Sequence, residues 1–228
     1  MLQEKAQVMY DDIKGVTPHI TSHREHFRHK PTSFGDWLAK SIVHTLSLTA
    51  TLLFKKRYGH RAVVLETIAA VPGMVGGAFQ HLKALRFIRD DRGWIKTLLD
   101  EAENERMHLM IYNELTNPTG FERILILIVQ IFFYSMFSFL YFFSPNTAHR
   151  VVGYLEEEAV HSYETYLRLV HEGAHENVQA TIFAKSYWKL EDDARLTDMI
   201  EATIKDEMLH RDVNHKFADD AHASLWTR

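Results

Sequence analysis

The sequence of 228 residues contains no cysteine. Disulfide bonds, zinc–thiolate sites and catalytic thiols are therefore excluded, and any bound metal must be held by oxygen and nitrogen ligands. The same absence means that cysteine usage gives no information about the redox compartment. Histidine is abundant instead, with 15 residues, so a single histidine says little about a metal site.

Proline and glycine are also scarce, with 5 and 10 residues, so long helices can run without interruption. No segment keeps the alternation of apolar and polar residues that is typical of a strand. The chain is 46% hydrophobic and 25% charged, which is the composition of a globular protein. These features predict an all-α fold.

Acidic and basic residues are nearly equal in number, which gives a net charge of −4. The sequence lacks the basic stripe of a nucleic-acid-binding protein, so we expect no nucleic-acid partner. The first residues, MLQEKAQVMYDDIKGV, include acids and lack the apolar core of a signal peptide. They also lack the basic, serine-rich character of an organelle transit peptide, which leaves a bacterial protein or a trimmed mature form as interpretations.

Seven helical segments are predicted after an irregular arm over residues 1–33, and residues 34–228 are expected to form one domain. The segments cover about 33–56, 60–88, 93–115, 121–143, 147–171, 177–188 and 194–217. Ser33 and Asp36 have the spacing of a capping box. Gly173 is placed as a C-cap. The glycines that follow Pro72 indicate close helix packing or a kink.

Two copies of the pattern Glu-x-x-His carry the main functional signal, at Glu105–His108 and Glu207–His210. Glutamate and histidine three residues apart lie on one face of a helix. One copy alone is usually a surface pair, but two copies match four of the six ligands of a dinuclear site in a four-helix bundle. Such a site needs one further glutamate from each of two other helices.

Glu66 and Glu156 are predicted to be those further glutamates. Glu66 stands alone in the apolar run VVLETIAA. Among three consecutive glutamates, Glu156 shares its helix face with apolar residues, whereas Glu157 and Glu158 fall on more polar sides. Four carboxylates and two imidazoles suit a pair of iron or manganese ions. Without a metal, burying four carboxylates would be costly.

The neighbouring polar residues receive simpler predictions. Asn104 and Asp206 each lie four residues before a ligand histidine and could orient an imidazole. Glu101 and Glu103 are assigned to the solvated face of their helix.

Residues 124–143 are apolar except for a few polar residues, which is long enough to span a membrane. A span there would put the two halves of the ligand set on opposite sides of the bilayer. We therefore expect helices of about 34–56 and 121–143 to lie on the surface of one leaflet. For the first helix, ordinary core packing is the alternative. Lys55, Lys56 and Arg57 would lie near anionic headgroups.

Four blocks of the sequence resemble the alternative oxidase family, over roughly residues 55–217. They are RAVVLETIAAVPGMVGG, GWIKTLLDEAENERMHLM, HRVVGYLEEEAVHSY and DEMLHRDVNH. The resemblance implies a ferritin-like four-helix bundle with two iron ions, on Glu66, Glu105, His108, Glu156, Glu207 and His210. It also implies a homodimeric ubiquinol oxidase of the respiratory chain that reduces O₂ to water, pumps no protons and resists cyanide. Such enzymes lie on the cytoplasmic face of a bacterial inner membrane or the matrix face of the mitochondrial inner membrane.

The resemblance also assigns roles around the metal. The redox-active tyrosine of the family falls on Tyr163. Its quinol cavity falls on Arg61, Leu65, Ala159 and Ser162. Its hydrogen-bonded residues around the ligands fall on Asn104, Asp206, His149, Tyr187 and Trp188.

Two departures from the family pattern are visible. Ile204-Lys205 stands where many members have Arg-Ala, and the missing cysteines predict that thiol-based regulation is absent. The alternative functions are a di-iron membrane hydroxylase or desaturase, a ferritin-like iron-storage protein, and a plastid-type quinol oxidase.

Overall fold

The computed structural model describes residues 28–54 and 57–226, which contain seven helices and a single isolated β-bridge between Gln179 and Arg195. The helices are α2 (Phe34–Phe54), α3 (Tyr58–Phe87), α4 (Trp94–Thr116), α5 (Gly120–Phe143), α6 (Pro145–His171), α7 (Ile182–Trp188) and α8 (Leu196–Trp226). The predicted all-α fold is confirmed. The predicted arm lies mostly outside the described residues, and residues 28–33 contain no helix.

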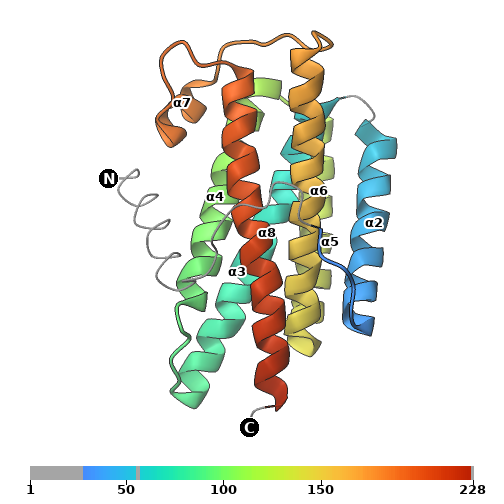
Figure 1. The fold of residues 1–228 in the computed structure, drawn as a ribbon, viewed down its shortest axis with the longest axis vertical. Coiled ribbons are helices and arrows are strands. Elements are labelled where there is room, and N and C mark those ends of the chain that lie inside the picture. The colour runs from blue at the N-terminus through green and yellow to red at the C-terminus, as the bar shows by residue number, and fades with distance from the viewer. Residues whose placement is uncertain (1–27, 55–56, 227–228) are drawn as a thin grey trace.

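Four long helices, α3, α4, α6 and α8, form the bundle (Figure 1). Helix α3 packs along α4, α6 packs along α8, and α3 also contacts α6. Helices α2 and α5 lie on one side of this bundle, where α2 packs on α6 and α5 packs on α3 and α6 (Figure 1). The short α7 packs against α4 at one end.

Helix ends follow local hydrogen bonding. The Ser33 amide donates to Asp36 Oδ2 and the Asp36 amide donates to Ser33 Oγ, both at 3.1 Å, so the predicted capping box is confirmed. A second capping box, between Thr119 and Glu122, starts α5 and was not predicted. Gly173 adopts a φ of 76°, as its predicted C-cap position requires.

Two predicted helix boundaries were wrong. Helix α7 begins at Ile182 rather than near 177, because residues 178–180 pair with the segment before α8 and Thr181 caps the helix. Helix α8 continues to Trp226 instead of ending near 217. No proline or glycine follows residue 217 to stop it.

The glycines of α3 bring this helix close to α4. Helix α3 runs continuously through Pro72, although a disturbance was expected there. A Cβ atom on Gly73 would lie 2.3 Å from the carbonyl oxygen of Leu98 and 3.0 Å from Ala102 Cβ. Only a residue without a side chain fits this approach, so the interpretation as close helix packing is confirmed.

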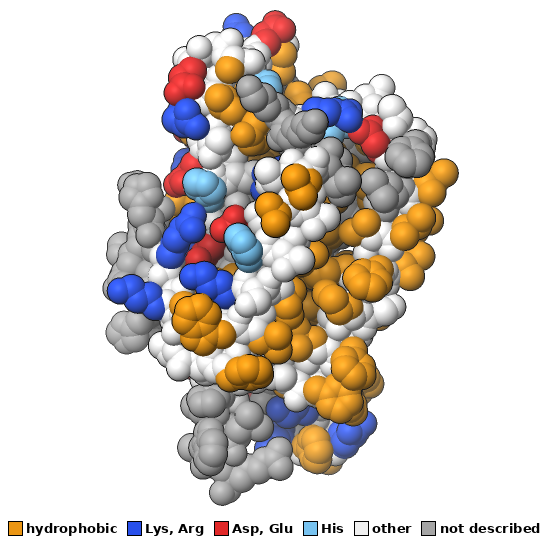
Figure 2. All heavy atoms as spheres, turned by 90° about the vertical axis from the view of Figure 1, so that its right-hand side faces the viewer, with side chains coloured by type: hydrophobic (Ala, Val, Ile, Leu, Met, Phe, Trp, Pro, Cys, Tyr) orange, Lys and Arg blue, Asp and Glu red, His pale blue; other side chains and the backbone are white. Residues whose placement is uncertain are grey.

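The outer face of α2 and α5 is apolar and exposed. Phe133, Phe137 and Tyr141 bury one side of α5. Many of the other large apolar side chains of the two helices are exposed and form a broad hydrophobic band (Figure 2). We call this the apolar face; it consists of Phe34, Trp37, Leu38, Leu48, Leu52, Ile124, Leu127, Ile128, Ile131, Phe132, Tyr134, Phe139, Phe142 and Phe143.

The close approach of α3 and α4 can be tested with Gly73→Ala. We expect the substitution to lower the free energy of unfolding by about 1–3 kcal/mol, because the new methyl group collides with backbone of α4. Urea denaturation followed by circular dichroism measures this. Gly120→Ala is the matched control, since nothing lies within 4 Å of a Cβ there. Equal stability of the two variants would contradict the packing described.

Candidate metal centre

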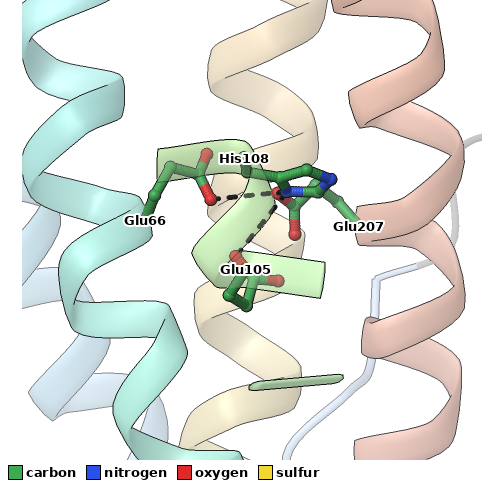
Figure 3. A group of neighbouring side chains, drawn as sticks. All are labelled: Glu66, Glu105, His108 and Glu207. Carbon is green, nitrogen blue, oxygen red and sulfur yellow. Dashed lines mark ion pairs between the residues drawn. The ribbon is translucent and has the colours of Figure 1, made fainter. Parts of the chain in front are cut away.

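The centre of the bundle contains a cluster of buried carboxylates and imidazoles. Glu66 of α3, Glu105 and His108 of α4, and Glu207 of α8 each offer one ligand atom, and these atoms all lie within 4.8 Å of one another. Figure 3 shows these four side chains pointing toward one another from three helices. Residues that lie as far apart in the sequence as Glu66 and Glu207 thus meet in one site.

The other two predicted ligands lie beside this group. His210 Nδ1 is 2.6 Å from Glu105 Oε1 and 3.7 Å from Glu207 Oε2. Glu156 of α6 is 2% exposed, and the nearby charges of Glu207 and Glu105 act on its carboxyl group. All six residues chosen from spacing and helical phase are therefore brought together.

Every one of the six residues carries a buried polar atom without a hydrogen-bond partner among the described residues. The atoms are Glu66 Oε2, Glu105 Oε1 and Oε2, His108 Nδ1, Glu156 Oε1, Glu207 Oε2 and His210 Nδ1, with His210 Nε2 in addition. Buried polar atoms are normally paired, so a cluster of this kind needs an explanation. An oxygen-rich donor set with two imidazoles fits a pair of iron or manganese ions.

The charges in the cluster are strongly coupled. Burial raises the pKa of Glu66 and Glu156, and neighbouring carboxylates raise it further. Burial alone would lower the pKa of His108 and His210, but the surrounding carboxylates outweigh it and raise both. The cluster therefore has a high affinity for positive charge. Metal binding would displace protons from these groups.

His108 is oriented by a residue from the opposite helix. Its Nδ1 faces the site, 3.5 Å from Glu66 Oε2 and 3.3 Å from Glu207 Oε1, and its Nε2 is 3.1 Å from Asp206 Oδ2. Asp206 precedes His210 in sequence, yet it contacts His108. Asp206 was expected to orient an imidazole, and the structure shows that this imidazole belongs to His108 of α4 rather than to His210 of its own helix.

Besides its contact with His108, Asp206 accepts hydrogen bonds from two further side chains. Trp188 Nε1 donates to its Oδ2 at 2.9 Å, and Asn104 Nδ2 donates to the same atom at 3.1 Å. Asn104 Nδ2 also donates to the Tyr187 hydroxyl at 2.6 Å. Four of the five residues that the family resemblance assigned to this network therefore surround His108.

His149, the fifth, lies farther from the ligands. Its ring nitrogens contact the Tyr141 hydroxyl at 2.9 Å and Asn214 Oδ1 at 3.1 Å. Burial lowers the pKa of His149 to about 4, so it is neutral at physiological pH. Within the described part of the chain, its hydrogen-bonded link toward the site runs through Asn214.

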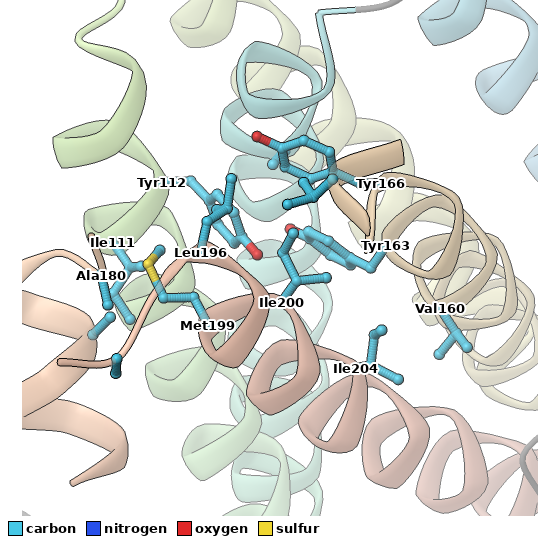
Figure 4. Packing of buried hydrophobic residues seen from close by; sticks show 14 of the residues in the cluster. Ile111, Tyr112, Val160, Tyr163, Tyr166, Ala180, Leu196, Met199, Ile200 and Ile204 are labelled. Atoms are coloured by element: carbon cyan, nitrogen blue, oxygen red, sulfur yellow. The ribbon is translucent and has the colours of Figure 1, made fainter. Parts of the chain in front are cut away.

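Tyr163 lies directly against the ligand cluster. Its hydroxyl donates a hydrogen bond to Glu66 Oε1. Its ring stacks on that of Tyr112, with centroids 5.3 Å apart, and Tyr112 contacts Thr203 Oγ1 at 3.0 Å. Figure 4 shows both tyrosines within the apolar cluster. Tyr112 was not predicted, although it lies one turn after His108 on the same face.

A cavity of about 230 Å³ lies between α2, α3, α5 and α6. Arg61, Leu65 and Ala159 line it, as the family resemblance implied, and so does Glu156. The cavity therefore extends from the apolar face to one of the candidate ligands. Ser162, the fourth predicted residue, is not among the lining residues.

The prediction for Glu101 was wrong. Glu103 is exposed and forms an ion pair with Arg106, as a solvated residue would, but Glu101 is 2% exposed. Burial raises the pKa of Glu101 to about 7, and its Oε2 accepts a hydrogen bond from Asn214 Nδ2 at 2.8 Å. Glu101 lies one turn before Glu105 on the same helix face, which could have indicated its burial. The charged residues next to it in the sequence favoured the solvated interpretation instead.

Comparison with known proteins agrees with this geometry. A family model described as alternative oxidase matches residues 18–219. The chain is 54% identical to ubiquinol oxidase 2, mitochondrial, of Glycine max, over 85% of this chain and 58% of that protein. It is 53% identical to ubiquinol oxidase, mitochondrial, of Mangifera indica, over 84% of this chain and 60% of that protein.

A third relative, ubiquinol oxidase 2, mitochondrial, of Arabidopsis thaliana, is 51% identical over 84% of this chain and 54% of that protein. The chain thus matches less than two thirds of the length of each of these relatives. The residues matched by the family model, 18–219, contain all of the residues of the site.

Proposed function

The chain belongs to the alternative oxidase family, and from this premise we propose that it is a quinol oxidase that reduces O₂ to water. In this reaction two quinols and one O₂ give two quinones and two waters. The observation that supports the proposal most directly is the buried set of four carboxylates and two imidazoles beside a cavity. No proton is pumped in the proposed reaction, and no haem is involved, so cyanide should not inhibit it.

The proposed ligands of two iron ions are Glu66, Glu105, His108, Glu156, Glu207 and His210. Bound iron would supply one-electron valence changes and a binding place for O₂. The residues of the chain hold the pair in a water-poor environment, because the ligands are buried in the bundle. Asp206 fixes His108 so that Nδ1 remains directed at the site.

Tyr163 is proposed to take part in electron transfer. Reduction of O₂ takes four electrons, and Tyr163 lies within hydrogen-bond contact of a proposed ligand. When the tyrosine ring loses an electron, its phenolic proton can move to Glu66 Oε1. Full turnover by Tyr163→Phe would exclude the role.

The cavity is the proposed quinol site. Its wall is largely apolar, and Arg61 provides a donor for a quinol oxygen. Arg61 Nε is buried without a hydrogen-bond partner among the described residues, and its Nη1 donates to Thr51 Oγ1 at 3.3 Å. A quinol ring in the cavity would reach Glu156 and, through it, the proposed metal ligands. A contact with Ser162 stays a prediction.

We propose that the apolar face rests on one leaflet of a membrane (Figure 2). Two helices, α3 and α5, are long and apolar enough to cross a bilayer by length and composition. More than half of the apolar window in α3 is buried in the bundle, on the side that carries Glu66, so these buried residues belong to the core. Helix α5 lies alongside α3 and α6. Crossing by α5 would carry the bundle into the bilayer.

Further parts of the proposal follow from the family. Quinol would enter from the leaflet, because the cavity opens among residues of α2 and α5. We propose an energy-transducing membrane, either the matrix face of the mitochondrial inner membrane or the cytoplasmic face of its bacterial counterpart. The proposed homodimer would use exposed apolar residues of α3 and α4, such as Leu82, Leu85 and Leu99. Residues 34–228 are proposed to act as one domain.

Oxygen uptake tests the proposed activity. Purified, iron-loaded protein should consume O₂ when a short-chain ubiquinol and cyanide are present, and Glu207→Ala should reduce uptake to the rate without protein. Glu201→Ala, an exposed carboxylate on the same helix, is the matched control and should keep the wild-type rate. No uptake by wild-type protein with two bound irons would favour the hydroxylase or storage alternatives.

Membrane contact is tested by binding to vesicles of anionic phospholipid. Ile128→Glu and Phe139→Glu, both on the apolar face, should each weaken binding by about tenfold or more, because each replaces an apolar side chain that the lipid would bury. Ile182→Glu is the control, since Ile182 is 79% exposed on α7, away from the apolar face. Equal binding by all three variants would rule out this orientation.

A further inference from the structure

Glu101 is a fifth buried carboxylate at the level of the proposed metal centre, and the ligand set does not include it. It lies on α4 one turn before Glu105. One oxygen, Oε2, accepts a hydrogen bond from Asn214 Nδ2, and the other, Oε1, has no partner among the described residues. A carboxylate held in this way needs a second donor.

Asn214 has a single possible orientation. Its amide group contacts Glu101 Oε2 at 2.8 Å and the carbonyl oxygen of His210 at 3.0 Å, and both are acceptors. The NH₂ group must therefore face them. Oδ1 then faces His149 Nδ1 at 3.1 Å, which must carry the hydrogen. Asn214 thus ties Glu101 to the helical turn that presents His210.

The rest of the chain of hydrogen bonds has a fixed direction as well. Because His149 Nδ1 donates, its Nε2 accepts from the Tyr141 hydroxyl at 2.9 Å. The Tyr141 oxygen accepts in turn from Gln80 Nε2 at 3.1 Å. Each member donates toward Glu101, so the chain stabilises its carboxylate and fixes the position of Asn214.

His210 is the one proposed ligand whose second ring nitrogen has no assigned partner. His108 directs Nδ1 at the site while Asp206 of the opposite helix holds Nε2. His210 likewise directs Nδ1 at Glu105, but its buried Nε2 has no hydrogen bond among the described residues.

We propose that Glu101 is the positioning residue of His210, as Asp206 is for His108. In the metal-bound protein, Glu101 Oε1 accepts the hydrogen of His210 Nε2 while Oε2 keeps the bond from Asn214. Two donors thus converge on two acceptor oxygens, which only a carboxylate supplies. The contact fixes the ring and increases the basicity of Nδ1. This inference rests on the proposed metal centre.

Metal affinity tests the inference without turnover. Metal-free full-length protein is titrated with Mn²⁺, and free Mn²⁺ is followed by electron paramagnetic resonance. Wild type should bind two ions. Glu101→Gln should weaken one of the two sites by about 10–100-fold, because glutamine has one acceptor oxygen for two donors. Glu103→Gln removes the same charge from the exposed face of α4 and should bind as wild type does.

A double-mutant cycle then identifies the histidine concerned. In a His108→Ala background, Glu101→Gln should weaken the remaining site by the same factor. In a His210→Ala background, it should have no further effect. Asp206→Asn should give the opposite pattern, with its effect lost only in His108→Ala.

The possible results separate the two proposals. No Mn²⁺ binding by wild type would overturn the metal centre itself. Two sites in wild type with Glu101→Gln equal to Glu103→Gln would overturn only the role of Glu101, as would an effect that persists in His210→Ala. Thermal unfolding of the metal-free variants checks folding. Glu101→Met, which keeps volume but neither hydrogen bond, replaces the glutamine variant if that does not fold.

Discussion

Negative charge buried at one level of the bundle is the constraint on which the other features depend. Carboxylates from α3, α4, α6 and α8 meet where each side chain is almost inaccessible to water. Ionised carboxylates in such a place are costly without compensating cations. The two histidines, the hydrogen-bond donors around Asp206 and the chain that ends at Glu101 all reduce this cost. The core of this protein is thus built around a polar centre and completed by apolar packing above and below it.

The helices can bring these groups together because they approach one another closely where it matters. Gly73 and its neighbouring glycines let α3 lie against the backbone of α4. Gly153 does the same for α6 and α8, since a Cβ there would lie 2.5 Å from His215 Nδ1. The close packing of α3 on α4 and of α6 on α8 fixes the positions of the candidate ligands along the bundle axis. The looser sides of the bundle face α2 and α5, and there the cavity remains.

Much of this arrangement could be predicted from the sequence because it depends on local rules. Helical phase selected Glu156 among three consecutive glutamates, and the spacing of Glu-x-x-His placed each pair on one face. The capping box at Ser33 depends on residues three apart. Such relations hold whatever the remainder of the chain does.

The parts that could not be predicted depend on which helix faces which. The sequence marked Asp206 as a residue that could orient a histidine, but the packing of α4 against α8 assigns it to His108. Glu101 appeared to be solvated because charged residues surround it in sequence, and only the position of Asn214 on α8 explains its burial. The start of α7 depends on a backbone pairing between segments that flank it.

The crossed contact between Asp206 and His108 also constrains how the protein is made. Glu105 and Glu207 are separated by about a hundred residues, and each histidine is held by groups from the other end of the chain. Neither helix pair can prepare a complete binding place by itself. Synthesis must therefore pass α8 before any part of the centre takes its final shape, and the closure of this long-range contact is slow compared with helix formation. A metal ion bound at this centre would accordingly be loaded only after α8 has been synthesised.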